Sequence, residues 1–177
     1  MDAYYYSALD LATIISSQNL CCQEESRMID MIWEGEKKLL DSKYQNDKKR
    51  FILDVYYWMH YFYEKPILDR EFFVIQKDFE RSNCTVQVQQ YMSDYSDLDL
   101  FFKNIRICIL YGKGNNYVKI KLRSLLKQYG YKRRSPLLLQ HINGCLRFYR
   151  LEVTLRGGVP CSIEEVGLDQ MLIFRVI

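Results

Sequence analysis

The junction at residues 130–136 constrains the fold of this chain more than any other stretch. Gly130 follows a run whose leucines fall on one helical face, and it can end that helix because glycine tolerates positive φ. A few residues later, Ser135 offers a capping hydroxyl and Pro136 suits the first helical position, where its missing N–H costs nothing. The sequence therefore predicts two consecutive helices joined by a short turn.

The stretches around these two helices predict strands. Residues 105–111, "IRICILY", are few and rich in β-branched side chains, which is typical of a strand. Residues 151–158, "LEVTLRGG", predict a strand entering a glycine turn, and residues 171–177 predict a closing strand. The expected order is strand, helix, tight turn, helix, strand, loop, strand. This is the order of a winged helix-turn-helix if a helix of the N-terminal half serves as its first helix.

The helix that starts at Pro136 is expected to have an apolar and a polar face. Its apolar stripe consists of Leu138, Ile142, Cys145, Leu146 and Tyr149. Gln140, Asn143 and Arg147 follow one another at i, i+3 and i+7 on the other side. In a helix-turn-helix the second helix enters the major groove, where Gln and Asn pair with adenine and Arg pairs with guanine. The polar face is therefore a candidate for reading bases.

The first hundred residues predict helices. Apolar residues recur at helical spacing over residues 8–15 and again over residues 28–39. Asn46 or Asp47 can cap a third helix, which runs through an aromatic-rich stretch. This part of the chain is thus expected to be mainly α-helical.

Residues 66–91 are expected to contain a helix break, a further helix and a strand. Pro66 would stop the third helix, residues 68–79 repeat the helical pattern, and residues 85–91 alternate like an exposed strand. The predicted fold class is therefore α+β. An acidic, aromatic-rich helical region occupies residues 1–100, and a basic winged helix-turn-helix-like region occupies residues 101–177.

Charge is distributed very unevenly between these two regions. Residues 1–100 carry 11 Lys and Arg against 18 Asp and Glu, a net charge of −7, and residues 101–177 carry 14 against 4, a net charge of +10. Thirteen basic residues and a single acid, Glu152, lie between Lys103 and Arg156. Such asymmetry indicates a polyanionic partner for the basic region. The alternative is that the acidic and basic halves of the chain cover each other.

A basic surface is expected to surround the two helices. Basic residues on the first helix and in the turn would contact phosphates, and one at the glycine turn would reach a flanking groove from a wing. The predicted nucleic-acid-binding residues are Lys121, Arg123, Lys127, Lys132, Arg133, Arg134, Gln140, Asn143, Arg147 and Arg156. If six to eight of these charges met phosphates, log affinity would fall against log salt with a slope of roughly −5 to −7.

The sequence therefore predicts a non-enzymatic nucleic-acid-binding protein. It would be a DNA-binding regulator, or an accessory subunit of a larger complex, and its partner would be double-stranded DNA. The alternative is a protein–protein interaction or structural subunit that uses the winged-helix-like module to dock an acidic partner.

The aromatic stretch of the third helix predicts a core or an interface between subunits. Its members surround the helix instead of forming a single stripe: Tyr56, Tyr57, Trp58, Tyr61, Phe62 and Tyr63. Tyrosine and tryptophan favour surfaces that are apolar at one end and wet at the other. We therefore expect the N-terminal half to bind a protein partner or to form a homodimer.

Catalytic signals are weak. Arg134 and His141 have the spacing of a metal-independent ribonuclease motif, but Pro136 separates Arg134 from the helix that carries His141. A histidine on a helix surface or partly buried is the more common explanation. The sequence thus predicts no catalytic residue, with this ribonuclease as the low-ranked enzyme alternative.

Six scattered cysteines form no CxxC pair. In the absence of a secretory signal, most are expected to be buried reduced thiols rather than disulfides. The sequence predicts no metal ligands and no cofactor. The N-terminal residues lack a basic signal-peptide region and no apolar run is long enough for a membrane span, so a cytoplasmic protein without membrane contact is expected.

Overall fold

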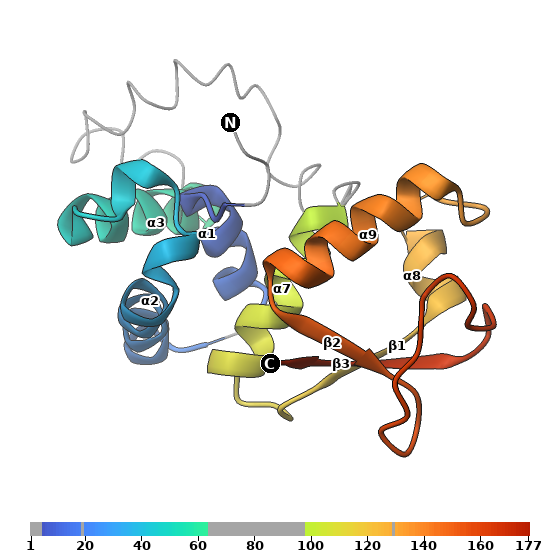
Figure 1. Cartoon of the computed structure of the whole chain (residues 1–177). Helices are drawn as coiled ribbons and strands as arrows, with labels where there is room; N and C mark the ends of the chain where they lie inside the picture. Colours follow the sequence, from blue (N-terminus) through green and yellow to red (C-terminus); the bar gives the residue numbers. More distant parts are fainter. Residues whose placement is uncertain (1–4, 19, 64–97, 129) are drawn as a thin grey trace. The chain divides into compact units, whose positions relative to one another are not determined.

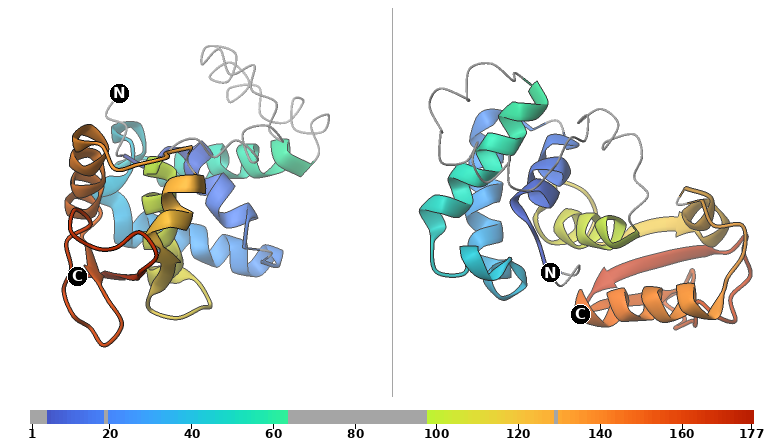
Figure 2. Two further views of the ribbon diagram at one scale, coloured as in Figure 1. Left: turned by 90° about the vertical axis from the view of Figure 1, so that its right-hand side faces the viewer. Right: turned by 90° about the horizontal axis from the view of Figure 1, so that it is seen from above.

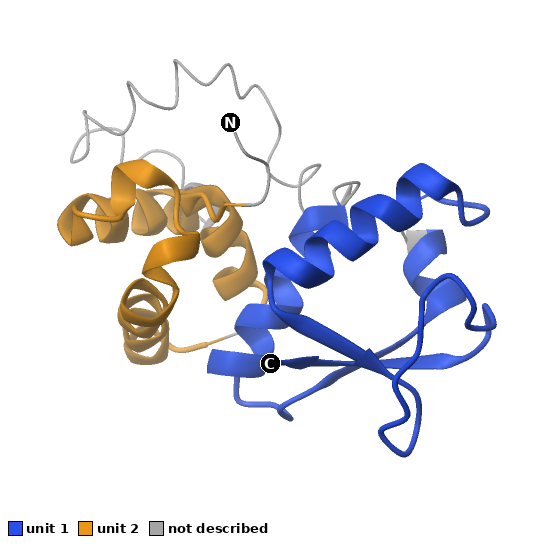
Figure 3. Cartoon of the chain, in the orientation of Figure 1, with its two compact units in different colours: residues 1, 3, 95–177 blue, residues 2, 4–94 orange. Residues whose placement is uncertain are grey.

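The computed structural model describes residues 5–18, 20–63, 98–128 and 130–177. The chain divides into two compact units, one formed mainly by residues 4–94 and the other mainly by residues 95–177 (Figure 3). Together they combine helices with a three-stranded antiparallel sheet, so the α+β class is confirmed (Figure 1). Among the described helices, none is both long enough and apolar enough for a bilayer crossing.

The unit of residues 4–94 is helical in its described part, as predicted. Its elements are α1 (Ala8–Ser16), α2 (Cys22–Glu36), η1 (Lys37–Leu39), η2 (Ser42–Tyr44) and α3 (Lys48–Tyr63). Ser7 caps α1 with its side chain, and Asp10 bonds back to the Ser7 amide. Both α1 and α2 pack against α3. The helix expected at residues 68–79 and the strand expected at residues 85–91 lie outside the described residues.

A buried polar group sits within this helical unit. The Tyr44 hydroxyl donates a hydrogen bond of 2.6 Å to Oδ2 of Asp54 on α3. The Lys43 ammonium and the Arg50 guanidinium lie 3.9 and 3.8 Å from the same oxygen. Burial, and then the bond to Asp54, raise the pKa of Tyr44 well above its ordinary value. The carboxylate of Asp54 is therefore surrounded by a hydroxyl and two cations.

The unit of residues 95–177 contains a sheet whose central strand is the last in sequence. Its elements are α7 (Leu98–Tyr111), β1 (Val118–Lys121), α8 (Leu122–Gln128), α9 (Pro136–Phe148), β2 (Leu151–Thr154) and β3 (Met171–Val176). The strand order is β1-β3-β2, and Phe174 pairs with Val118 on one side and Val153 on the other. In the view of Figure 1, α8 and α9 lie above this sheet.

The prediction of a strand at residues 105–111 is wrong, because these residues form the second half of α7. β-branched residues favoured a strand locally, but Phe102 and Ile105 continue an apolar repeat that starts at Leu98, and this repeat fits a helix. The strand lies instead at Val118–Lys121. The first helix beside the sheet is consequently α7, which belongs to the unit of residues 95–177 and not to the helical unit of residues 4–94.

The core of this unit holds the helices on the sheet. The rings of Phe101 and Phe102 on α7 meet Phe174 edge-on, with centroid separations of 6.0 and 6.1 Å. The predicted start of α9 is confirmed, since Ser135 accepts a bond from the Leu138 amide and proline follows it. Two further views (Figure 2) show α9 running beside the strands of the sheet.

Candidate functional site

Arg134 anchors the loop between β2 and β3, residues 155–170. Its Nη1 atom lies 2.7–2.8 Å from the carbonyl oxygens of Ile163, Glu164 and Val166. Nη1 carries two N–H groups, so the three carbonyl oxygens share its two hydrogens. Arg134 thus joins the turn before α9 to the loop, instead of standing free for a phosphate.

Two more of the predicted binding residues hold the same loop. Arg123 on α8 forms a two-bond ion pair with Asp169, with N–O distances of 2.6 and 2.8 Å. This pair raises the pKa of Arg123 and lowers that of Asp169. Asn143 on α9 donates to Glu164 at 3.1 Å. The loop is therefore fixed to α8, to the turn and to α9.

The other predicted binding residues are all exposed: Lys121, Lys127, Lys132, Arg133, Gln140, Arg147 and Arg156. Lys132 and Arg133 lie in the turn between α8 and α9. Gln140 and Arg147 are on the exposed side of α9, where Leu137 is 79% exposed. Arg156 precedes Gly157 and Gly158, whose positive φ angles of 88° and 79° form the tight turn of the loop. The basic excess of this unit is therefore directed largely to solvent.

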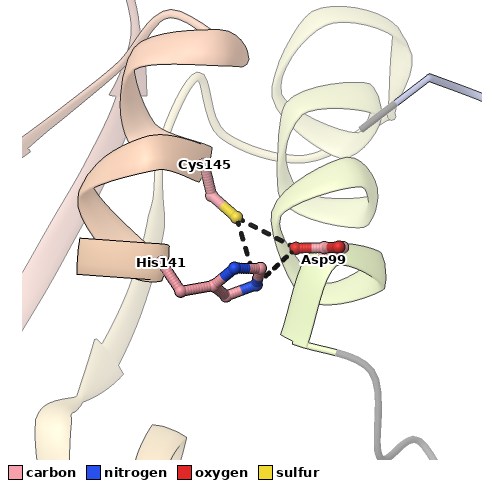
Figure 4. A group of neighbouring side chains, drawn as sticks. All are labelled: Asp99, His141 and Cys145. Carbon is pink, nitrogen blue, oxygen red and sulfur yellow. Dashed lines mark hydrogen bonds and ion pairs between the residues drawn. The ribbon is translucent and has the colours of Figure 1, made fainter. Parts of the chain in front are cut away.

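A second polar group lies between α7 and α9 and consists of Asp99, His141 and Cys145 (Figure 4). His141 Nε2 is 2.7 Å from Asp99 Oδ1, and the Cys145 thiol donates to the same oxygen at 3.1 Å. The sulfur and His141 Nε2 are 3.8 Å apart. Asp99 and Cys145 are buried, while the side chain of His141 is 38% exposed. Three different donor atoms thus lie close together, two of them on buried residues and one on a partly exposed imidazole.

The helical spacing of α9 brings this group together. His141 and Cys145 are four residues apart and so lie on the same face of the helix. Asp99 belongs to the first turn of α7, which packs against α9. A second bond joins the same helices farther along, from the Arg106 guanidinium to the Tyr149 carbonyl at 2.6 Å. The position of each donor is therefore set by two packed helices.

The cluster contains residue types that can act as a nucleophile with a base, or as metal ligands. In a catalytic triad the carboxylate and the nucleophile must face opposite nitrogens of the imidazole. Here Nε2 of His141 is the nitrogen nearest both Asp99 and Cys145. The geometry therefore does not match a catalytic triad, whereas converging sulfur, nitrogen and oxygen atoms suit a metal ion.

Sequence reasoning missed this cluster. It placed Cys145 in the apolar stripe and predicted no metal ligands, and its expectation that His141 lies on the helix surface or is partly buried agrees with the 38% exposure of that side chain. A histidine and a cysteine at i, i+4 on a predicted helix were the available signal. Asp99 gave none, because its approach to α9 depends on tertiary packing. The ribonuclease alternative gains no support, since Arg134 holds the loop and His141 contacts Asp99.

The expectation that most cysteines are buried is wrong for the described part of the chain. Cys145 is buried, Cys108 and Cys161 are half-buried, and Cys21 and Cys22 are exposed. Burial raises the pKa of the Cys108 and Cys161 thiols. Burial in the core therefore does not account for the positions of most of the described cysteines.

Comparison of the chain with protein-family models, with curated proteins and with solved structures finds no match.

Proposed function

We propose that residues 95–177 form a winged helix-turn-helix that binds double-stranded DNA, with α9 in the major groove. The observation that carries this proposal is the topology. Helix α7 precedes β1, the pair α8 and α9 lies between β1 and β2, and the last strand, β3, is central in the sheet. A winged helix has this order of elements, with the wing as the loop between its second and third strands, so the topology supports the proposal.

The exposed charges support the same proposal. Lys132 and Arg133 precede α9, Arg147 lies on its exposed side, and Arg156 precedes the glycine turn of the loop after β2. Phosphate contacts from such positions would hold the helix in the groove. Gln140 is exposed on α9 and is the side chain best placed to pair with adenine.

The bonds of Arg123, Arg134 and Asn143 to the loop change their proposed role. They fix the wing to the two helices, and the proposed contacts with DNA come from the neighbouring basic residues. With Lys121, Lys127, Lys132, Arg133, Arg147 and Arg156 as the six phosphate contacts, log affinity should fall against log salt with a slope of roughly −5. This slope is at the shallow end of the range that the sequence predicts.

An electrophoretic mobility shift with a short duplex of arbitrary sequence, repeated over a salt series, tests the proposal. The double variant Lys132→Ala/Arg133→Ala should bind more weakly at low salt, and its salt slope should be shallower by about 2. The matched control is Lys38→Ala/Lys49→Ala, which removes two exposed charges from the other unit.

The control should bind DNA as the unaltered chain does. Absence of binding at low salt, or equal loss in both double variants, would refute the proposal. Single-stranded RNA competing better than the duplex would replace DNA by RNA as the partner.

A further inference from the structure

We propose that Asp99, His141 and Cys145 form a zinc-binding site that joins α7 to α9. The three donor atoms, Oδ1, Nε2 and Sγ, all lie within 4.8 Å of one another. They come from two helices that the core already holds in contact. This site goes beyond DNA binding, and its test does not depend on that function.

The distances between the three donor atoms fit a zinc ion. Tetrahedral zinc, with bonds of about 2.0–2.3 Å to oxygen, nitrogen and sulfur, holds its donors about 3.3–3.6 Å apart. The observed separations are 2.7 Å for nitrogen to oxygen, 3.1 Å for sulfur to oxygen and 3.8 Å for sulfur to nitrogen. Each pair therefore needs to move by only about 0.6 Å or less to reach zinc geometry.

The donor types select the metal. A thiolate and an imidazole are poor ligands for magnesium or calcium, which prefer oxygen, and both are good ligands for zinc. Spacing of i, i+4 on one helix face is also a common way to offer two ligands to zinc. Three protein ligands leave the fourth tetrahedral position for water.

Zinc binding would displace the protons that the ligand atoms now carry. The Cys145 thiol now donates to Asp99 Oδ1, and zinc would bind the thiolate in its place, so the Sγ–H bond breaks and the proton leaves to solvent. Nε2 of His141 now donates its proton to Asp99 Oδ1, 2.7 Å away. On zinc binding this proton leaves to solvent, or moves through solvent to Nδ1 if the ring is neutral, and the freed Nε2 lone pair binds the metal with the ring proton on Nδ1. Asp99 Oδ1, which now accepts hydrogen bonds, would become the third ligand.

Cobalt(II) substitution in the full chain tests this site, because a cobalt–thiolate bond gives a charge-transfer band in the near ultraviolet. The background protein carries Cys21→Ser, Cys22→Ser and Cys84→Ser, which removes other thiols in the first half of the chain. It should bind one cobalt ion per chain with this band, and zinc should displace the cobalt. Adding Cys145→Ser should abolish the band, whereas the matched control Cys161→Ser should keep it.

Competition with a chromophoric chelator measures the zinc affinity of the ligand variants. Asp99→Asn and His141→Gln should each bind zinc roughly 100-fold more weakly or worse, because even a residue that only orients a ligand is worth 10–100-fold. Circular dichroism must match the background protein. If Asp99→Asn fails that check, the half-exposed His141→Gln carries the test.

A background protein that is folded but binds no cobalt, or binds it without the thiolate band, would overturn the proposal. Equal loss in Cys161→Ser and Cys145→Ser would overturn it as well. In either case Asp99, His141 and Cys145 would be a hydrogen-bonded cluster only.

Discussion

Asp54 and Asp99 are both buried aspartates, one in each unit, with side chains 7% and 5% exposed. Asp54 lies beside a tyrosine hydroxyl, an ammonium and a guanidinium. Asp99 lies beside an imidazole and a thiol. A buried carboxylate needs charge or hydrogen-bond donors in both places. Only the second set of neighbours contains the imidazole and the thiol that zinc favours, so the neighbours, and not the aspartate, decide whether zinc can bind.

The largest expected difference between the two aspartates is in the effect of their substitution on stabilisation by zinc. At a concentration about 100 times its dissociation constant, zinc should stabilise the chain by about 2.7 kcal/mol. The melting temperature should rise by roughly 5–10 °C, measured by circular dichroism. Asp54→Asn should keep this rise, and Asp99→Asn should lose it. A rise that persists in Asp99→Asn would show that zinc binds elsewhere.

Removing the hydroxyl beside Asp54 should have the next largest effect. Tyr44→Phe removes a buried hydrogen bond to a carboxylate and should lower the free energy of unfolding by about 1.5 kcal/mol, because Lys43 and Arg50 remain near the charge. Urea denaturation measures this change in the free energy of unfolding. The control Tyr56→Phe, at a half-buried position, should cost less. Equal losses would mean that the bond to Asp54 adds no stability.

The same hydroxyl predicts a dependence on pH. Its pKa is raised in the folded state, so the folded chain keeps the proton that the unfolded chain loses above its ordinary pKa of 10.0. Stability from Tyr44 is therefore complete below that pH and falls by about 1.4 kcal/mol per unit above it. Urea denaturation of the unaltered chain and of Tyr44→Phe on both sides of pH 10 should show the two stabilities converging. Parallel curves would contradict this.

The smallest effect concerns the start of α9. Ser135→Ala removes the cap on the Leu138 amide and should lower the free energy of unfolding by about 1 kcal/mol. Zinc affinity should stay unchanged, because His141 and Cys145 lie farther along the helix. Chelator competition checks this, and a fall in affinity would show that the cluster depends on the helix end.

Local signals in the sequence predicted most of the helices but not the polar contacts between segments. Ser135 and Pro136 act within one turn of chain, so their pattern predicts the start of α9 correctly. The strand expected at residues 105–111 failed because its β-branched residues also continue the apolar face of α7. Arg134 and Asp99 have partners 29–32 and 46 residues away, so their roles depend on the tertiary fold.

The position of β3 has a consequence for when the unit of residues 95–177 can fold during synthesis. This strand pairs with both β1 and β2, yet it is translated after them. Until it leaves the ribosome, neither of the other two strands has a hydrogen-bonding partner in the sheet, and such long-range pairing is slow to form. We therefore expect this unit to fold after its synthesis, with two unprotected strand edges that chaperones can bind in the meantime.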